Sequence, residues 1–207
     1  MEYYSQHGQD RWLDQEVFKE KTQGFSIEIG SFNGEAFSNT CFFERFRQWD
    51  GICIEPHPKY FAQMAEKRKC RQLNCAVGEI ECLAEFWELE GYTSMLSGIT
   101  SEYDPAHQQR IERELAEHGG TKRVIQVPVR RLGNILAEAG VTEVDYLSVD
   151  TEGSELSILK SIDWNQVKIH YLSVENNYQT SEISDYLIPL GYQLINTLGT
   201  DEIYALR

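Results

Sequence analysis

Glycines and acids follow the first two predicted strands of this chain in a pattern that suits a nucleotide-like ligand. Gly30 and Gly34 come after the strand that carries Glu28, and glycine lets a backbone turn tightly and approach a ligand closely. Glu55 ends the next strand, where a carboxylate can accept two hydrogen bonds from the hydroxyls of a ribose. Because ligands bind outside the carboxyl ends of strands in an open α/β sheet, this pattern predicts an adenosine-containing cofactor. A GxGxxG motif is absent, which disfavours an NAD-linked dehydrogenase.

Two further acids, Asp150 and Glu175, end two later predicted strands. Neighbouring strands lie about 5 Å apart, so these carboxylates would repel each other unless a cation, a shared proton or water relieves the repulsion. Oxygen ligands of this kind, with Asn176 beside them, suit a hard ion such as Mg²⁺. Alternatively, Asp150 accepts hydrogen bonds from backbone amides of the next helix. The pattern leaves both interpretations open.

Several side chains could accept a proton from a substrate bound at these strand ends. Asp150 and Glu175 are two of them, and a histidine is the third. His7 lies in a polar N-terminal segment that could fold over a cofactor, and His107 belongs to a predicted helix in the middle of the chain. We therefore take Asp150, Glu175 and His7 as the candidate catalytic residues.

The elements that must position these side chains alternate along the chain. Short apolar runs that are typical of strands are separated by segments of helical periodicity, which predicts a mostly parallel sheet with helices on both faces. One helix is expected directly after Gly34, and residues 198–201 suit a hairpin turn between the last two strands. The predicted strands of this sheet are residues 25–29, 52–54, 73–77, 144–149, 169–174, 192–195 and 203–206.

Residues 83–130 break this alternation and predict an insertion. Residues 83–89 and 124–129 are strand-like, and a helix begins at Asp104-Pro105 and ends before Gly119. This helix carries only Ile111 and Leu115 as large aliphatic residues. Residues 91–120 therefore form either a lid over the site or a solvated surface insertion.

Composition limits the function classes. The chain has 207 residues, is 41% hydrophobic and carries a formal net charge of −14, which predicts a single domain and disfavours nucleic acids and anionic membranes as partners. No apolar stretch is long enough to span a bilayer and the N-terminus has no secretory signature, so we expect a cytoplasmic protein. The five cysteines show no metal-ligand spacing and are expected to be buried or incidental.

Four segments together resemble successive motifs of the FkbM-type methyltransferases, and SQHGQD at 5–10 resembles a segment that many members carry ahead of the first strand. The four segments are FSIEIGSFNG (25–34), CIEPHP (53–58), NCAVG (74–78) and LSVDTEGSE (147–155). The resemblance implies a Rossmann-like class I methyltransferase sheet, seven-stranded and mostly parallel with an antiparallel last strand, and S-adenosylmethionine (AdoMet) as the methyl donor. It also implies O-methylation of a small-molecule hydroxyl, such as one on a sugar or natural product. The alternatives are a methyltransferase acting on nitrogen or a carboxylate, and a non-catalytic AdoMet- or nucleotide-binding module.

The resemblance also assigns roles to individual residues. Glu28 and Gly30 would line the methionine end of AdoMet, Glu55 would hold the ribose, and Asp150 would lie beside the sulfonium. Related enzymes hold Mg²⁺ with acids that match Asp150 and Glu175 and with a neighbour that matches Asn176, and Gly153 stands where one of them has a histidine base. Residues 1–20 are expected to cover the cofactor and substrate, and a homo-oligomer is left open. The full set of expected cofactor-binding residues is Gln6, Glu28, Gly30, Ser31, Asn33, Gly34, Glu55, Pro56, Cys75, Ala76 and Asp150.

Overall fold

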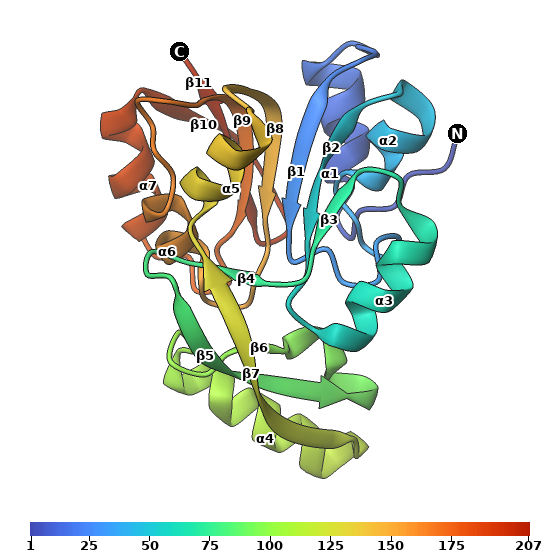
Figure 1. Ribbon diagram of the computed structural model, residues 1–207, viewed down its shortest axis with the longest axis vertical. Coiled ribbons are helices and arrows are strands. Elements are labelled where there is room, and N and C mark those ends of the chain that lie inside the picture. The colour runs from blue at the N-terminus through green and yellow to red at the C-terminus, as the bar shows by residue number, and fades with distance from the viewer.

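The computed structural model describes all 207 residues and contains a seven-stranded sheet in the order β10-β11-β9-β8-β1-β2-β3 (Figure 1). Only β11 runs antiparallel to its neighbours. The predicted sheet, with its antiparallel last strand, is therefore confirmed, and so is the hairpin turn, because Leu198 pairs with Asp201. The strands are β1 (Phe25–Ile29), β2 (Asp50–Ile54), β3 (Arg71–Leu73), β8 (Glu143–Val149), β9 (Lys168–Glu175), β10 (Tyr192–Leu198) and β11 (Asp201–Leu206).

Helices cover both faces of this sheet (Figure 1). Successive side chains of a strand point to opposite faces, so neighbouring residues of β8 pack into different clusters. Leu147 belongs to a cluster of 23 buried residues, to which three helices contribute: α5 (Leu132–Ala139), α6 (Glu155–Lys160) and α7 (Glu182–Leu187). Its neighbour Tyr146 belongs instead to an aromatic cluster with Phe42, Phe43 and Trp49. That cluster is built on α1 (Gln9–Trp12), a π-helical segment (Leu13–Val17) and α2 (Cys41–Arg47). The chain outside the insertion also contains α3 (Pro58–Lys67) and a 3₁₀ turn (Ile188–Leu190). No helix of the chain has the length and apolar character of a membrane span.

A second, four-stranded sheet in the order β4-β7-β5-β6 contains the predicted insertion. Figure 1 shows it beyond the lower ends of the larger sheet's strands, at the bottom of the view, together with α4. Its elements are β4 (Ala76–Val77), β5 (Cys82–Glu90), a 3₁₀ segment (Gly91–Leu96), β6 (Gly98–Ile99), α4 (Pro105–His118) and β7 (Thr121–Arg130). The predicted helix at 105–118 is confirmed, since the Asp104 side chain caps it by accepting the Ala106 N–H. Ile111 of α4 packs on Leu89, Leu96 and Tyr103.

Two predicted elements differ from the structure. The single strand expected at 73–77 is divided between the two sheets, because the Asn74 side chain donates to the Glu55 carbonyl and diverts the chain after β3. The helix expected directly after Gly34 begins only at Cys41. Residues 35–40 form a loop instead, in which the Asn33 carboxamide oxygen accepts the N–H groups of residues 35 and 36.

Candidate active site

A cavity lies between the carboxyl ends of the parallel strands and the smaller sheet; we call it the central cavity. Its space, including the open mouth, is about 910 Å³. Its walls come from loops that follow four strands of the larger sheet and from the smaller sheet. Its wall includes Gln6, Gly30, Ser31, Phe32, Ser38, Glu55, Pro56, His57, Tyr60, Cys75, Ala76, Phe86, Ile99, Asp150, Glu152 and Glu175.

Gly30 shapes the turn that follows β1. Its φ is +85°, in the left-handed region, and its N–H donates to the Ile54 carbonyl at 3.0 Å. A Cβ at this position would overlap the backbone oxygen of Asp150. Two strand ends therefore approach so closely here that only glycine fits, and the backbone is left open to the cavity.

Glu55 is held at the cavity wall by two backbone donors. Its Oε2 accepts the Phe32 N–H at 2.7 Å and its Oε1 accepts the His57 N–H at 2.8 Å. Burial raises the pKa of Glu55 to about 8, although the two N–H donors act in the opposite direction. A carboxylate oxygen has more than one lone pair, so the fixed Glu55 can still accept hydrogen bonds from a ligand.

Asp150 and Glu175, on the ends of the paired strands β8 and β9, form an acidic pair in the cavity wall. Burial is the main cause that raises the pKa of Asp150 to about 7, and neighbouring acids add to it, while a hydrogen bond with Glu175 acts against it. The pKa of Glu175 is also raised, by burial and by the charges of Asp150 and Glu152. The Glu175 Oε2 is buried and has no hydrogen-bond partner. The pair therefore favours sharing a proton, or a positively charged neighbour.

Comparison with known proteins identifies the family. The family model described as the methyltransferase FkbM domain matches residues 28–194. The chain belongs to the FkbM methyltransferase family. A search of curated proteins gives no match.

Among solved structures, the chain is similar to an FkbM methyltransferase from Methylobacillus flagellatus KT, with a TM-score of 0.53 and 14% identity. The match covers 88% of this chain but 43% of the other, so the chain spans less than half the length of that relative. Another similar structure is a precorrin-6y C5,15-methyltransferase from Geobacter metallireducens (TM-score 0.43, 8% identity, 90% of this chain and 82% of the other). At such identities the first likeness shows the fold, and the second carries no further argument.

Several residues that the FkbM resemblance assigned to the cofactor do line the central cavity. Gly30, Glu55 and Asp150 do so from three neighbouring strand ends, and Gln6 closes the cavity from the N-terminal segment. The others are Ser31, Pro56, Cys75 and Ala76. The structure thus brings together eight of the expected residues, which lie more than 140 positions apart in the chain.

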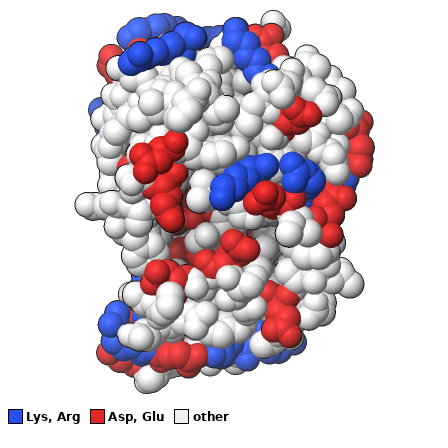
Figure 2. Space-filling model, turned by 90° about the vertical axis from the view of Figure 1, so that its left-hand side faces the viewer, with Lys and Arg blue, Asp and Glu red and all other residues white.

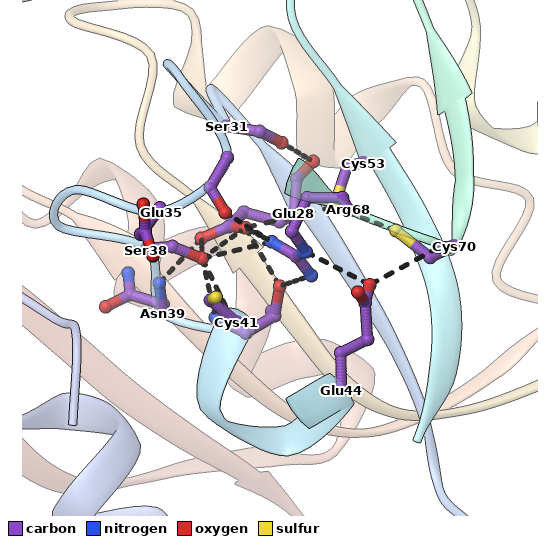
Figure 3. Close-up of polar contacts among 12 residues, drawn as sticks. Glu28, Ser31, Glu35, Ser38, Asn39, Cys41, Glu44, Cys53, Arg68 and Cys70 are labelled. Atoms are coloured by element: carbon purple, nitrogen blue, oxygen red, sulfur yellow. Dashed lines mark hydrogen bonds and ion pairs between the residues drawn. The ribbon is translucent and has the colours of Figure 1, made fainter. Parts of the chain in front are cut away.

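Glu28, Asn33 and Gly34 differ from that expectation, because they do not line the cavity. The Glu28 carboxylate accepts hydrogen bonds from the Ser38 and Thr40 hydroxyls, the Asn39 N–H and Arg68, all buried (Figure 3). Asn33 holds the next turn, as described above, and a Cβ on Gly34 would lie 2.8 Å from the Met64 Cγ of α3. These three residues support the loop behind the cavity wall, where Ser38 reaches the cavity itself.

The predicted metal set is not supported. No three His, Cys, Asp or Glu side chains are arranged to hold a metal ion. The Asn176 amide is also occupied, because its nitrogen donates to the Thr180 carbonyl and Glu202 and its oxygen accepts the Thr180 N–H. Asn176 therefore fixes the loop after β9 rather than pointing a free oxygen at Asp150 and Glu175.

His7 and Gly153 lie outside the central cavity. His7 is exposed and packs so closely on Gly199, in the β10–β11 turn, that a Cβ there would overlap its ring. Gly153 has a φ of +127°, and a Cβ would lie 2.8 Å from the Glu102 carbonyl oxygen, so a histidine at this position would be strained. The candidate acids, rather than a histidine at either place, are what the structure puts in the cavity wall.

Other wall residues had been given no role. The rings of Phe32 and Tyr60 are tilted by 41° with their centroids 4.1 Å apart, and the His57 ring lies beside Tyr60 at 4.4 Å. Glu152 follows Asp150 by two positions and shares the acidic wall, a relation that the spacing of the DTE sequence could have indicated. Phe86 and Ile99 come from the smaller sheet, and no local pattern indicates which wall they join.

Proposed function

We propose that this chain transfers the methyl group of AdoMet to a hydroxyl of a small molecule such as a sugar or natural product. The observation that carries the proposal is the convergence of the Gly30 turn, Glu55 and the Asp150–Glu175 pair in one cavity at the carboxyl edge of the sheet. Membership of a methyltransferase family supports methyl transfer as the reaction type.

The wall residues fit an adenosine-containing sulfonium. Glu55, fixed by two backbone donors, would accept hydrogen bonds from the ribose, and the Gly30 backbone leaves room for the methionine end. Cys75, Ala76 and Phe86 provide an apolar wall for the adenine. AdoMet supplies a methyl group activated by a positively charged sulfur, and the acids Asp150, Glu152 and Glu175 would stabilise that charge.

The protein's task in methyl transfer is alignment and proton acceptance. The acceptor oxygen must lie in line with the methyl–sulfur bond, which the shared cavity can enforce. As the new carbon–oxygen bond forms and the carbon–sulfur bond breaks, the hydroxyl proton must leave. Asp150, whose pKa is raised to about 7, is suited to receive it near neutral pH, and Glu175 can share it.

Calorimetric titration and product analysis together test this proposal. AdoMet should bind the purified protein at micromolar concentration, and incubation with hydroxylated metabolites should yield S-adenosylhomocysteine. Glu55→Gln should weaken AdoMet binding, whereas Asp150→Asn should retain binding of S-adenosylhomocysteine, which carries no sulfonium charge, and lose turnover. Failure of both AdoMet and S-adenosylhomocysteine to bind would overturn the assignment of the cavity. Binding without product for any acceptor would favour a non-catalytic module instead.

A further inference from the structure

A second hollow adjoins the central cavity, and its walls are acidic; we call it the acidic chamber. Glu152 and Glu175 line both spaces, so the chamber opens beside the proposed site of methyl transfer. Its walls include six acids, one histidine and no lysine or arginine. Figure 2 shows acidic side chains gathered around and within a hollow on this side of the molecule. The acids and the histidine of the wall are Glu102, Asp104, His107, Glu152, Glu155, Glu175 and Glu182.

An unpaired polar atom in the chamber wall indicates a missing ligand. The Oε2 of Glu175, which lines both spaces, is buried and has no hydrogen-bond partner. Buried polar atoms are nearly always paired in folded proteins, so this oxygen points to a bound molecule that supplies a hydrogen-bond donor.

Burial and the charge of Asp150 raise the pKa of Glu152 to about 8, so this acid favours a positively charged neighbour. Glu155 is satisfied by the N–H groups of Thr151 and Gly153, but Glu152 receives only a 3.4 Å hydrogen bond from the Asn177 side chain. His107 Nδ1 lies 3.6 Å from the Glu152 Oε2, but burial lowers the pKa of His107 and favours its neutral form.

The two nearby cations also leave the chamber acidic. Arg110, whose charge acts on Glu152 and Glu175, is bound to Glu114 on its own helix. Lys160 lines a neighbouring hollow rather than this one. The acids shared with the central cavity thus have no cationic partner of their own.

We propose that the methyl acceptor carries a protonated amine, which Glu152 and Glu175 bind in the acidic chamber while the acceptor's hydroxyl reaches Asp150 in the central cavity. This inference rests on the proposed function, because it assigns the chamber to the acceptor of that reaction. The chamber lacks a positive charge beside its acids and a hydrogen-bond donor for the unpaired Glu175 oxygen, and an ammonium group supplies both. A neutral acceptor would leave the acids without a counter-charge, and an anionic acceptor would be repelled by them.

A matched pair of sugars tests this inference. 6-Amino-6-deoxyglucose and glucose differ by one charged group, and each would be titrated into the S-adenosylhomocysteine-saturated protein at pH 7.5 and physiological salt. The amino sugar should bind at least about tenfold more tightly than glucose, as expected for one charge-assisted contact. Glu152→Gln should remove most of this preference and Glu102→Gln part of it. Glu66→Gln, which changes the same charge at an exposed position on α3, should leave it unchanged.

The outcomes separate this inference from the proposed function. Equal binding of the two sugars, no binding of the amino sugar, or a preference that survives both chamber variants would overturn it. Magnesium chloride titrated alone provides a further arm: binding of Mg²⁺ that depends on Glu152, without a preference for the amino sugar, would assign the chamber to a metal ion. If S-adenosylhomocysteine does not bind, the proposed function fails, and the sugar comparison repeated on the protein alone still tests the chamber.

Discussion

The Arg68 Nη1 lies 3.1 Å from the Glu28 Oε2, and the two side chains are 1% and 4% exposed. The same guanidinium binds Glu44 through its Nε, at 3.0 Å, and the Thr40 hydroxyl. One buried arginine on the segment after α3 thus connects β1 to the loop behind the central cavity and to α2 (Figure 3). The position of that cavity wall depends on a charge pair that never touches the cavity.

Breaking this pair should destabilise the protein strongly. Arg68→Met leaves Glu28 buried without its counter-charge, and we expect a loss of about 3–5 kcal/mol in the free energy of unfolding. The double variant Glu28→Gln, Arg68→Met should lose clearly less than the sum of the two single losses, because no uncompensated charge remains at Glu28. Urea denaturation of the four proteins measures both quantities. Additive losses would show that the pair is not coupled.

Gly30 and Gly8 provide a matched test of the turn after β1. Both have left-handed φ angles, +85° and +82°, but a Cβ at Gly8 meets nothing within 4 Å, whereas one at Gly30 overlaps the Asp150 carbonyl. Each alanine variant should lose about 1–2 kcal/mol from backbone strain. Gly30→Ala should lose about 1–3 kcal/mol more from the overlap, and should also bind S-adenosylhomocysteine poorly. Thermal unfolding and calorimetry compare them, and equal stability of the two variants would contradict the close approach.

The pKa of Glu55, about 8, makes ligand binding depend on pH. Ribose hydroxyls donate hydrogen bonds, so binding favours the ionised carboxylate, lowers its pKa and releases a proton near pH 7. Affinity for S-adenosylhomocysteine should therefore rise between about pH 6.5 and 8.5 and then level off. The neutral thioether of this ligand avoids charge effects on Asp150, Glu152 and Glu175. Calorimetry in two buffers of different ionisation heat measures the proton release, which Glu55→Gln should reduce; an unchanged release in this variant would assign the proton elsewhere.

The sequence predicted those parts of the fold and site that depend on local patterns. The run from Glu28 to Gly34, and the acids at the ends of β2, β8 and β9, can be recognised because strand ends and turns are encoded by adjacent residues. The role of Glu28 could not, since it depends on Arg68, 40 positions away, whose side chain enters the same buried network. The division at Asn74 likewise depends on a hydrogen bond to another strand end. Side-chain contacts between distant segments leave no periodic signal in the sequence.

Asp150→Asn should lower turnover and, at high pH, stabilise the protein. Burial raises the folded-state pKa of Asp150 to about 7, above its ordinary value near 4, so the folded state binds more protons than the unfolded state between these values. The stability that protonated Asp150 contributes is therefore fully present below about pH 4 and is lost progressively as the pH rises through about 7. An asparagine at this position avoids the buried charge, and its amide can donate to the unpaired oxygen of Glu175.

We accordingly expect Asp150→Asn to exceed the wild type by at least about 1 kcal/mol in unfolding free energy at pH 8, since each unit of pKa shift corresponds to about 1.4 kcal/mol, and to show no such gain at pH 4. Methyl transfer should fall by about 10²–10⁴-fold, as expected when a general base is removed. Urea denaturation at the two pH values and S-adenosylhomocysteine release measure these effects, with Glu66→Gln as the control for net charge. A stability difference that is the same at both pH values would show that Asp150 does not titrate in this range. Undiminished turnover would move the proton acceptor from Asp150 to Glu175 or another group.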